Sequence, residues 1–131
     1  MRWLLGLTMV LSFEAVAQKA EARLDCIHTG KDFIYDCVIE IQRQGLPLTD
    51  LDVRMSADMP SMPMAHQVKP VRADATSTPG EYRARLDLEM GGEWAVKLRL
   101  AGPVRDQLVL HYEFDERGAR PVRGSGKPPR K

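Results

Sequence analysis

Apolar and polar residues alternate with a period of two along most of the chain. The clearest run extends from Tyr82 to Met90, where every second residue is apolar and each residue between is charged. This alternation is typical of a β-strand with one buried face, whereas a helix would show a period of 3.6. Similar runs occupy residues 24–27, 33–41, 51–55, 67–71, 94–100 and 104–114. The pattern therefore predicts about seven strands.

Turn residues separate these runs. The turn sequences lie at residues 29–32, 44–47, 77–80 and 102–103. Short strands spaced in this way favour two antiparallel sheets packed face to face. We expect an all-β, immunoglobulin-like antiparallel β-sandwich in a single domain, with a small barrel as the alternative. Gly91 and Gly92 predict a reversal of the chain, and hence a hairpin over residues 81–100.

The N-terminus has the pattern of a cleavable signal peptide. Arg2 precedes an apolar run from Trp3 to Phe13, and the small-x-small sequence Ala15-Val16-Ala17 follows. The run is shorter than the roughly 20 apolar residues that span a bilayer. We therefore expect residues 1–17 to be removed and the protein to be periplasmic. An uncleaved anchor that tethers the domain outside the membrane is the alternative.

The two cysteines are placed to form a disulfide. Cys26 lies in the first predicted strand and Cys37 in the second, with a turn between them. Paired cysteines in an exported protein are read first as a disulfide, and neighbouring strands allow its geometry. A redox or metal-binding pair is the alternative, but ten residues separate these cysteines where a redox motif has two.

Charge is distributed unevenly along the chain. Residues 117–131 carry six Lys and Arg and no acid, so this segment is +6 in a chain of net +1. Because it is rich in Pro and Gly and poor in apolar residues, we expect a disordered tail. The predicted folded domain, residues 18–116, then carries about −5, since the charges of the signal segment cancel. We expect no nucleic-acid partner outside the cytoplasm; the tail either touches lipid headgroups or only aids solubility.

No arrangement of residues indicates catalysis. The glycine-rich stretches do not match phosphate-binding loops, and the serines do not match a nucleophile elbow. His28, His66 and His111 are widely separated in the sequence. We therefore expect a protein that is not an enzyme.

Methionines are concentrated in one segment, MSADMPSMPMAH. Its members are Met55, Met59, Met62 and Met64, with His66 two positions further on. Two prolines break the segment, which predicts a loop or sheet edge rather than a central strand. Exposed methionine gains little from packing, so a role in ligand binding is favoured over a role in the core.

Thioether sulfur and imidazole nitrogen are ligands that suit Cu(I). Thioethers are neutral, so they bind without losing a proton. We expect Met59, Met62, Met64 and His66 to bind copper, with Met90 as a further candidate. If the segment is extended, the spacing of Met62, Met64 and His66 places them on one face. The alternative is that Met62 and Met64 plug the end of the sandwich and His66 is a surface residue.

Three stretches resemble the YtkA-like and FixH-like family of small exported β-sandwich domains. They are ADMPSMPM at 57–64, PGEYRARLDLEMGGEW at 79–94 and AVKLRL at 95–100. The family is associated with copper handling, beside haem-copper oxidase assembly or in heavy-metal efflux. The resemblance implies metal binding by Met59, Met62 and Met64, and His66 is a reasonable addition here.

Two functions follow as hypotheses. The first is a periplasmic copper chaperone or buffer that passes Cu(I) by ligand exchange to an oxidase-assembly or efflux protein. The second is a protein-interaction module without metal, in which the methionine-rich loop is an adaptable contact surface.

Overall fold

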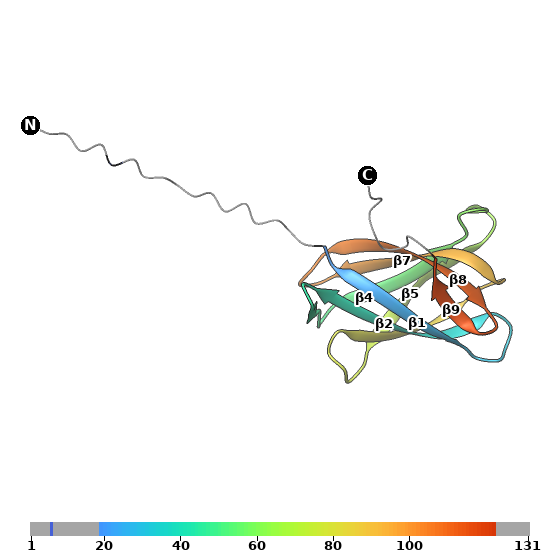
Figure 1. Cartoon of the computed structure of the whole chain (residues 1–131), viewed down its shortest axis with the longest axis horizontal. Coiled ribbons are helices and arrows are strands. Elements are labelled where there is room, and N and C mark those ends of the chain that lie inside the picture. The colour runs from blue at the N-terminus through green and yellow to red at the C-terminus, as the bar shows by residue number, and fades with distance from the viewer. Residues whose placement is uncertain (1–5, 7–18, 123–131) are drawn as a thin grey trace, which may run out of the picture.

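The computed structural model describes Gly6 and residues 19–122, and these form an all-β structure (Figure 1). Apart from Gly6, the predicted signal peptide lies outside the described residues, as do residues 123–131 of the predicted tail. The strands are β1 (Glu21–His28), β2 (Ile34–Arg43), β3 (Leu46–Pro47), β4 (Asp52–Asp58), β5 (Gln67–Ala75), β6 (Glu81–Asp87), β7 (Gly92–Ala101), β8 (Asp106–Asp115) and β9 (Gly118–Pro121). No helix in the described part of the chain is long and apolar enough to cross a membrane.

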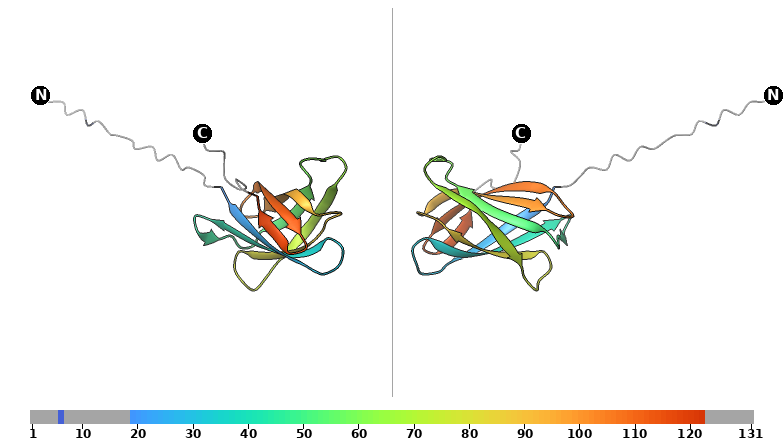
Figure 2. Two further views of the ribbon diagram at one scale, coloured as in Figure 1. Left: turned by 45° about the vertical axis from the view of Figure 1, so that its right-hand side comes forward. Right: turned by 180° about the vertical axis from the view of Figure 1, so that it is seen from behind.

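The strands pair antiparallel in the order β1-β2-β6-β5-β4-β7-β8-β9, with β3 on β2. One layer contains β1, β2, β3 and β6, and the other contains β4, β7, β8 and β9. Strand β5 links them: it pairs with β4 through most of its length and with β6 at Asp74 and Ala75. The right-hand view of Figure 2 shows β4 and β5 crossing the molecule side by side. The prediction of an all-β antiparallel fold is confirmed.

The two ends of this strand order come together, so the sheet is nearly closed. The backbone N–H of Leu24 in β1 donates to the Tyr112 hydroxyl of β8 at 3.1 Å. A Cβ atom on Gly118 of β9 would lie 2.7 Å from the carbonyl oxygen of Cys26 in β1. This close approach brings the fold near to the barrel alternative.

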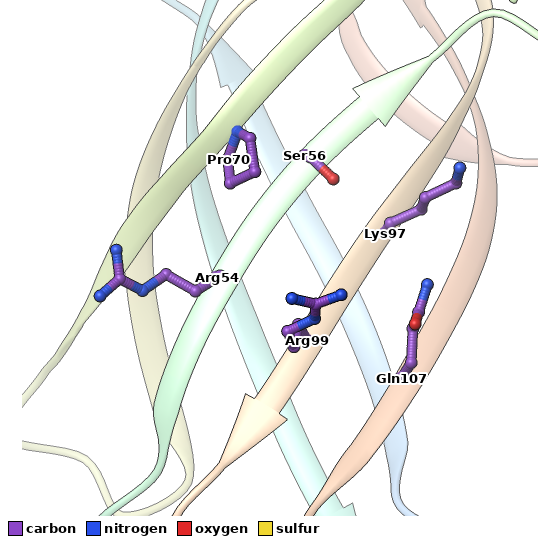
Figure 3. A pocket seen from close by; sticks show the side chains of 6 residues that line it. All are labelled: Arg54, Ser56, Pro70, Lys97, Arg99 and Gln107. Atoms are coloured by element: carbon purple, nitrogen blue, oxygen red, sulfur yellow. The ribbon is translucent and has the colours of Figure 1, made fainter.

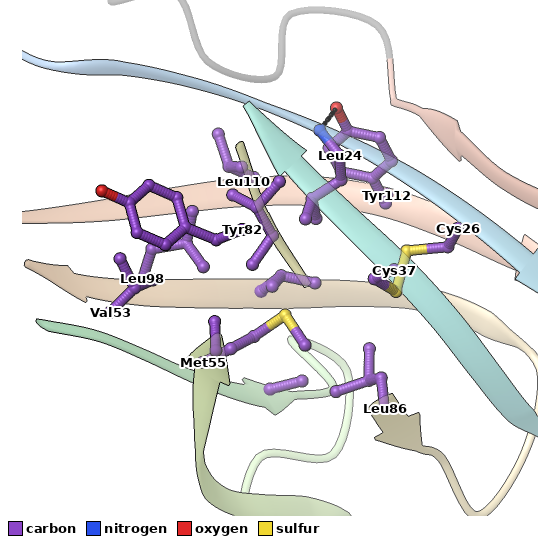
Figure 4. Close-up of a cluster of buried hydrophobic side chains, with 14 of the residues drawn as sticks. Leu24, Cys26, Cys37, Val53, Met55, Tyr82, Leu86, Leu98, Leu110 and Tyr112 are labelled. Atoms are coloured by element: carbon purple, nitrogen blue, oxygen red, sulfur yellow. Dashed lines mark hydrogen bonds between the residues drawn. A yellow bond between two sulfur atoms is a disulfide. The ribbon is translucent and has the colours of Figure 1, made fainter. Parts of the chain in front are cut away.

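The buried faces of the strands form one hydrophobic core, part of which is shown in Figure 4. In β2 the residues at alternate positions from Tyr35 to Ile41 are all buried, as the alternation predicts. Met55 of β4 and Trp94 of β7 enter the same core. The Trp94 indole N–H donates to the carbonyl oxygen of Met90 at 3.1 Å, so its polar atom is satisfied at the core's edge.

The predicted disulfide is present. Cys26 and Cys37 lie directly opposite each other in the β1–β2 register, with their Cα atoms 4.0 Å apart (Figure 4). The bridge faces the core, because both cysteines are buried. It therefore ties the edge strand β1 to its neighbour from the inside.

The predicted hairpin over residues 81–100 is wrong. Strand β6 pairs with β2 and β5, whereas β7 pairs with β4 and β8. The segment around Gly91 and Gly92 thus passes from one layer to the other. These glycines serve close packing instead of a hairpin turn: a Cβ on Gly91 would lie 3.0 Å from the carbonyl oxygen of Phe114, and one on Gly92 would lie 3.4 Å from Met59 Cε.

The predicted start of the tail at residue 117 is also corrected. Residues Gly118–Pro121 form β9, which pairs with β8 from Asp115 to Tyr112. This short strand carries few apolar residues and so lacks the alternation that marks the others. Its place in the sheet depends on Gly118, which lets the backbone approach β1.

Candidate metal centre

The methionine-rich segment forms the loop between β4 and β5, which projects from one end of the molecule (Figure 1). The backbone N–H of Met62 donates to the carbonyl oxygen of Met59 at 3.0 Å. The N–H groups of Ala65 and His66 both donate to the carbonyl oxygen of Met62, at 3.2 and 3.3 Å. At the base of the loop, the Met59 N–H donates to the His66 carbonyl oxygen at 3.3 Å.

These turns confirm the predicted loop and show that the segment is not extended. Met62, Met64 and His66 therefore do not lie on one face through a strand-like period of two. The physical reason is that Pro60 and Pro63 restrict φ and lack an N–H, which favours turns over a ladder of strand hydrogen bonds.

The three loop methionines have different environments. Met59 is 5% exposed and belongs to the hydrophobic core, whereas Met62 is 41% and Met64 91% exposed. Met59 packs beside Gly92, where a Cβ would meet its methyl group. Of the four predicted ligands, Met59 is thus a packing residue in this conformation. Met64 does not plug the end of the sandwich, in contrast to the alternative interpretation.

His66 is held by a residue that sequence reasoning missed. Its Nδ1 lies 2.6 Å from Oε2 of Glu89, in the segment between β6 and β7. In the sequence Glu89 is one of several charged residues that alternate with apolar ones, so nothing distinguished it. The contact joins two loops that are 23 residues apart along the chain.

The segment that carries Glu89 also carries Met90, whose side chain is partly exposed. Two hydrogen bonds anchor this segment: the Trp94 indole donates to Met90, and the Leu88 N–H donates to the carbonyl oxygen of Phe33 at 2.9 Å. A third thioether therefore lies on the segment that contacts His66.

The other histidines are engaged differently. His28 uses both ring nitrogens within its own loop: Nδ1 accepts from the Gly30 N–H at 2.9 Å, and Nε2 lies 2.8 Å from the carbonyl oxygen of Asp32. His111 Nδ1 lies 3.8 Å from Glu93 Oε1. Among the described residues, only His66 combines a carboxylate on one ring nitrogen with exposed methionines, Met62 and Met64, in its own loop.

Within the described residues, no three His, Cys, Asp or Glu side chains form a group that could hold a metal ion. Structural zinc sites are usually built from such a group. A site in this loop would therefore depend on the methionine sulfurs, which are the ligands that soft Cu(I) prefers.

A family model, described as YtkA-like, matches residues 9–99, which is more than half of the chain. The chain belongs to the YtkA-like family. No curated protein and no solved structure matches it. The YtkA-like match spans the methionine-rich loop and both cysteines, and it ends within β7. Strands β8 and β9 thus lie beyond the matched region.

Proposed function

We propose that this YtkA-like protein binds copper as Cu(I) in the periplasm and acts as a copper chaperone or buffer. One observation carries the proposal: the exposed thioethers of Met62 and Met64 share a loop with His66, which Glu89 holds by its Nδ1. Copper is the cargo, and no bond-making chemistry is required.

The exposure of the two methionines supports a role as ligands. A buried methionine stabilises a protein by filling space, but Met64 is almost fully exposed and gains little in this way. Leucine or a polar residue would serve equally well at such a position if only solubility or loop formation mattered. Two thioethers at a loop tip are useful where a soft ligand is needed.

The contact with Glu89 gives His66 the arrangement of a metal-binding histidine. Such histidines usually donate one ring N–H to a carboxylate, which fixes the tautomer and raises the basicity of the other nitrogen. With Nδ1 bound to Glu89, the Nε2 lone pair is the one left for a metal. We assign the ligand set as Met62, Met64 and His66, with Met90 as a further sulfur donor.

Met59 has a different role in this proposal. Its side chain anchors the start of the loop in the core, and its backbone N–H closes the base of the loop onto His66. It positions the ligands through packing. An exposed loop on an anchored base suits ligand exchange with a copper-receiving protein, such as an oxidase-assembly or efflux component.

The disulfide supports the proposed location. Cys26 and Cys37 form a bridge, and such bridges persist in oxidising compartments. In such a compartment, methionine holds copper where free cysteine would be oxidised.

A competition titration tests the proposal. The full-length chain, expressed with its own N-terminal segment, is titrated with Cu(I) against a chromophoric chelator. We expect one equivalent to bind, and the Met62→Leu/Met64→Leu variant to lose binding, because leucine keeps the volume and removes the sulfur. Met55→Leu is the matched control, since this methionine is fully buried and should leave affinity unchanged.

Glu89→Gln tests the role of the carboxylate. We expect the affinity for Cu(I) to fall about ten-fold, because removing the hydrogen-bond partner of a metal-ligating histidine typically weakens metal binding by at least this factor. If the wild type and Met62→Leu/Met64→Leu bind equally, the copper proposal is wrong.

The exposure of Met64 also favours a second function, an interaction module without metal. Exposed methionines adapt to the shape of a partner, and leucine replaces them with little loss. Under this function Met62→Leu/Met64→Leu keeps partner binding, and copper does not affect it.

A further inference from the structure

Three arginines stand side by side on the outer face of the β5-β4-β7-β8 layer. Arg72 in β5 lies directly opposite Arg54 in β4, and Arg54 lies directly opposite Arg99 in β7. Gln107 of β8 continues the row opposite Arg99. All four side chains are exposed. The row thus crosses three adjacent strands at one level.

Such a row lowers the stability of the fold. Like charges directly opposite each other on neighbouring strands are destabilising. Arg54 is partly compensated by Asp52, 3.2 Å from its Nε. For Arg72 and Arg99 there is no charged partner in the part of the chain that the structure describes. Two guanidinium groups are therefore available to an external anion.

Two members of the row, Arg54 and Arg99, line a hollow in the sheet surface (Figure 3). Its lining residues come from four strands and are Arg54, Ser56, Pro70, Lys97, Arg99 and Gln107. Lys97 is already paired with Asp58 at 2.7 Å. The hollow therefore offers guanidinium, hydroxyl and amide groups, the set that recognises carboxylates.

We propose that this arginine row binds an acidic segment of a partner protein through its Asp or Glu carboxylates. A guanidinium binds a carboxylate through two parallel hydrogen bonds, which a lysine cannot do. Strands lie about 4.8 Å apart, so the row spans about 10 Å. Alternate side chains of an extended peptide lie about 7 Å apart, so two carboxylates fit along the row.

The negative charge around the row favours a single extended peptide segment over an anionic membrane as its binding partner. Residues 19–122 contain 14 Lys and Arg and 17 Asp and Glu, a net charge of −3. The same face also exposes Glu93 and Glu113. A flat anionic bilayer would meet these acids as well as the arginines, whereas a single extended segment can lie over the row alone. The surface is independent of the copper proposal, since it involves neither loop of that site.

The test uses the full-length chain and a fluorescent peptide that alternates glutamate with glycine. We expect Arg72→Gln/Arg99→Gln to weaken peptide binding about five-fold or more, through the loss of two guanidinium–carboxylate contacts. Arg43→Gln/Arg83→Gln is the matched control, because it removes the same charge from exposed arginines on the other layer. It should change the affinity less than about two-fold.

Two further measurements test whether the row binds a peptide, supports the fold or binds lipid. The thermal midpoint of Arg72→Gln/Arg99→Gln should be unchanged or higher, since repulsion is removed; a lower midpoint would show that the row supports the fold and would overturn the proposal. Equal loss of peptide binding in both variants, or no binding by the wild type, would also overturn it. A vesicle flotation assay tests lipid as the occupant. If the protein floats with phosphatidylglycerol–phosphatidylcholine vesicles, if this depends on the arginines, and if the peptide does not displace the protein from the vesicles, then lipid binds the row and the proposal is overturned.

Discussion

Replacing Cys26 and Cys37 with alanine should lower the free energy of unfolding by about 3 to 4 kcal/mol at 25 °C. The bridge joins residues 11 positions apart. In the chain-entropy model a loop of this length accounts for about 3 kcal/mol, because the bridge restricts the unfolded chain. The loss of two buried sulfur atoms adds about 1 kcal/mol.

Urea unfolding followed by the fluorescence of Trp94 measures this change, because the indole is fully buried in the core. The loss is a large part of the roughly 5–15 kcal/mol that stabilises a typical domain. A reductant provides the control: it should destabilise the wild type to a similar degree and leave the alanine variant unchanged. A loss below about 1 kcal/mol would show that closing this loop does not stabilise the fold as the chain-entropy model requires.

Three further substitutions test the β8–β9 turn and Tyr35 of β2, whose hydroxyl donates to the carbonyl oxygen of Asp115. Gly118→Ala should lower the unfolding free energy by about 2 kcal/mol or more, because its φ of 122° strains alanine and the added Cβ would meet the Cys26 carbonyl oxygen; an unchanged urea midpoint would contradict this. A hydrogen bond from the Arg117 N–H lowers the pKa of Asp115, so the ionised carboxylate stabilises the fold above about pH 4 and that contribution is lost as the pH falls further. Asp115→Asn should therefore reduce the acid-induced fall in urea midpoint, and an undiminished fall would be the contrary result. Burial raises the pKa of Tyr35, so its neutral form stabilises the fold fully below about pH 10 and less as the pH rises above it; Tyr35→Phe should lose this alkaline dependence, and identical pH profiles would argue against it.

The longer strands were predictable because each has one buried face, which imposes a period of two, whereas the short strands β3 and β9 lack this pattern and were missed. Tyr35, Cys37, Ile39 and Ile41 show this in β2, where all four are buried. The disulfide was predictable because a turn separates two strands that each carry one cysteine. Both features depend on local sequence, and local sequence was sufficient for them.

Strand pairing was not predictable in the same way. Leu86 in β6 and Trp94 in β7 both enter the core, but they do so from strands that share no hydrogen bonds. Alternation shows that a strand has a buried face and does not show which strand lies beside it. The same limit hid the row formed by Arg72, Arg54 and Arg99, since their alignment depends on register between distant segments.

The candidate site was predictable in composition but not in arrangement. Met59 and Met64 belong to one motif, yet one is buried and the other is almost fully exposed. Their difference arises from the turns of the loop and from the space beside Gly92. The contact between His66 and Glu89 arises where two loops meet, which the pattern of neither loop indicates.

The most direct test of the copper proposal is a Cu(I) titration of protein labelled with ¹³C at the methionine methyl groups, followed by NMR. Each methionine reports separately. If copper binds at the proposed site, the Met62 and Met64 methyl signals shift and saturate at one equivalent, while the buried Met55 signal stays in place. Unchanged Met62 and Met64 signals, or equal shifts of all methionines, would contradict the proposed site.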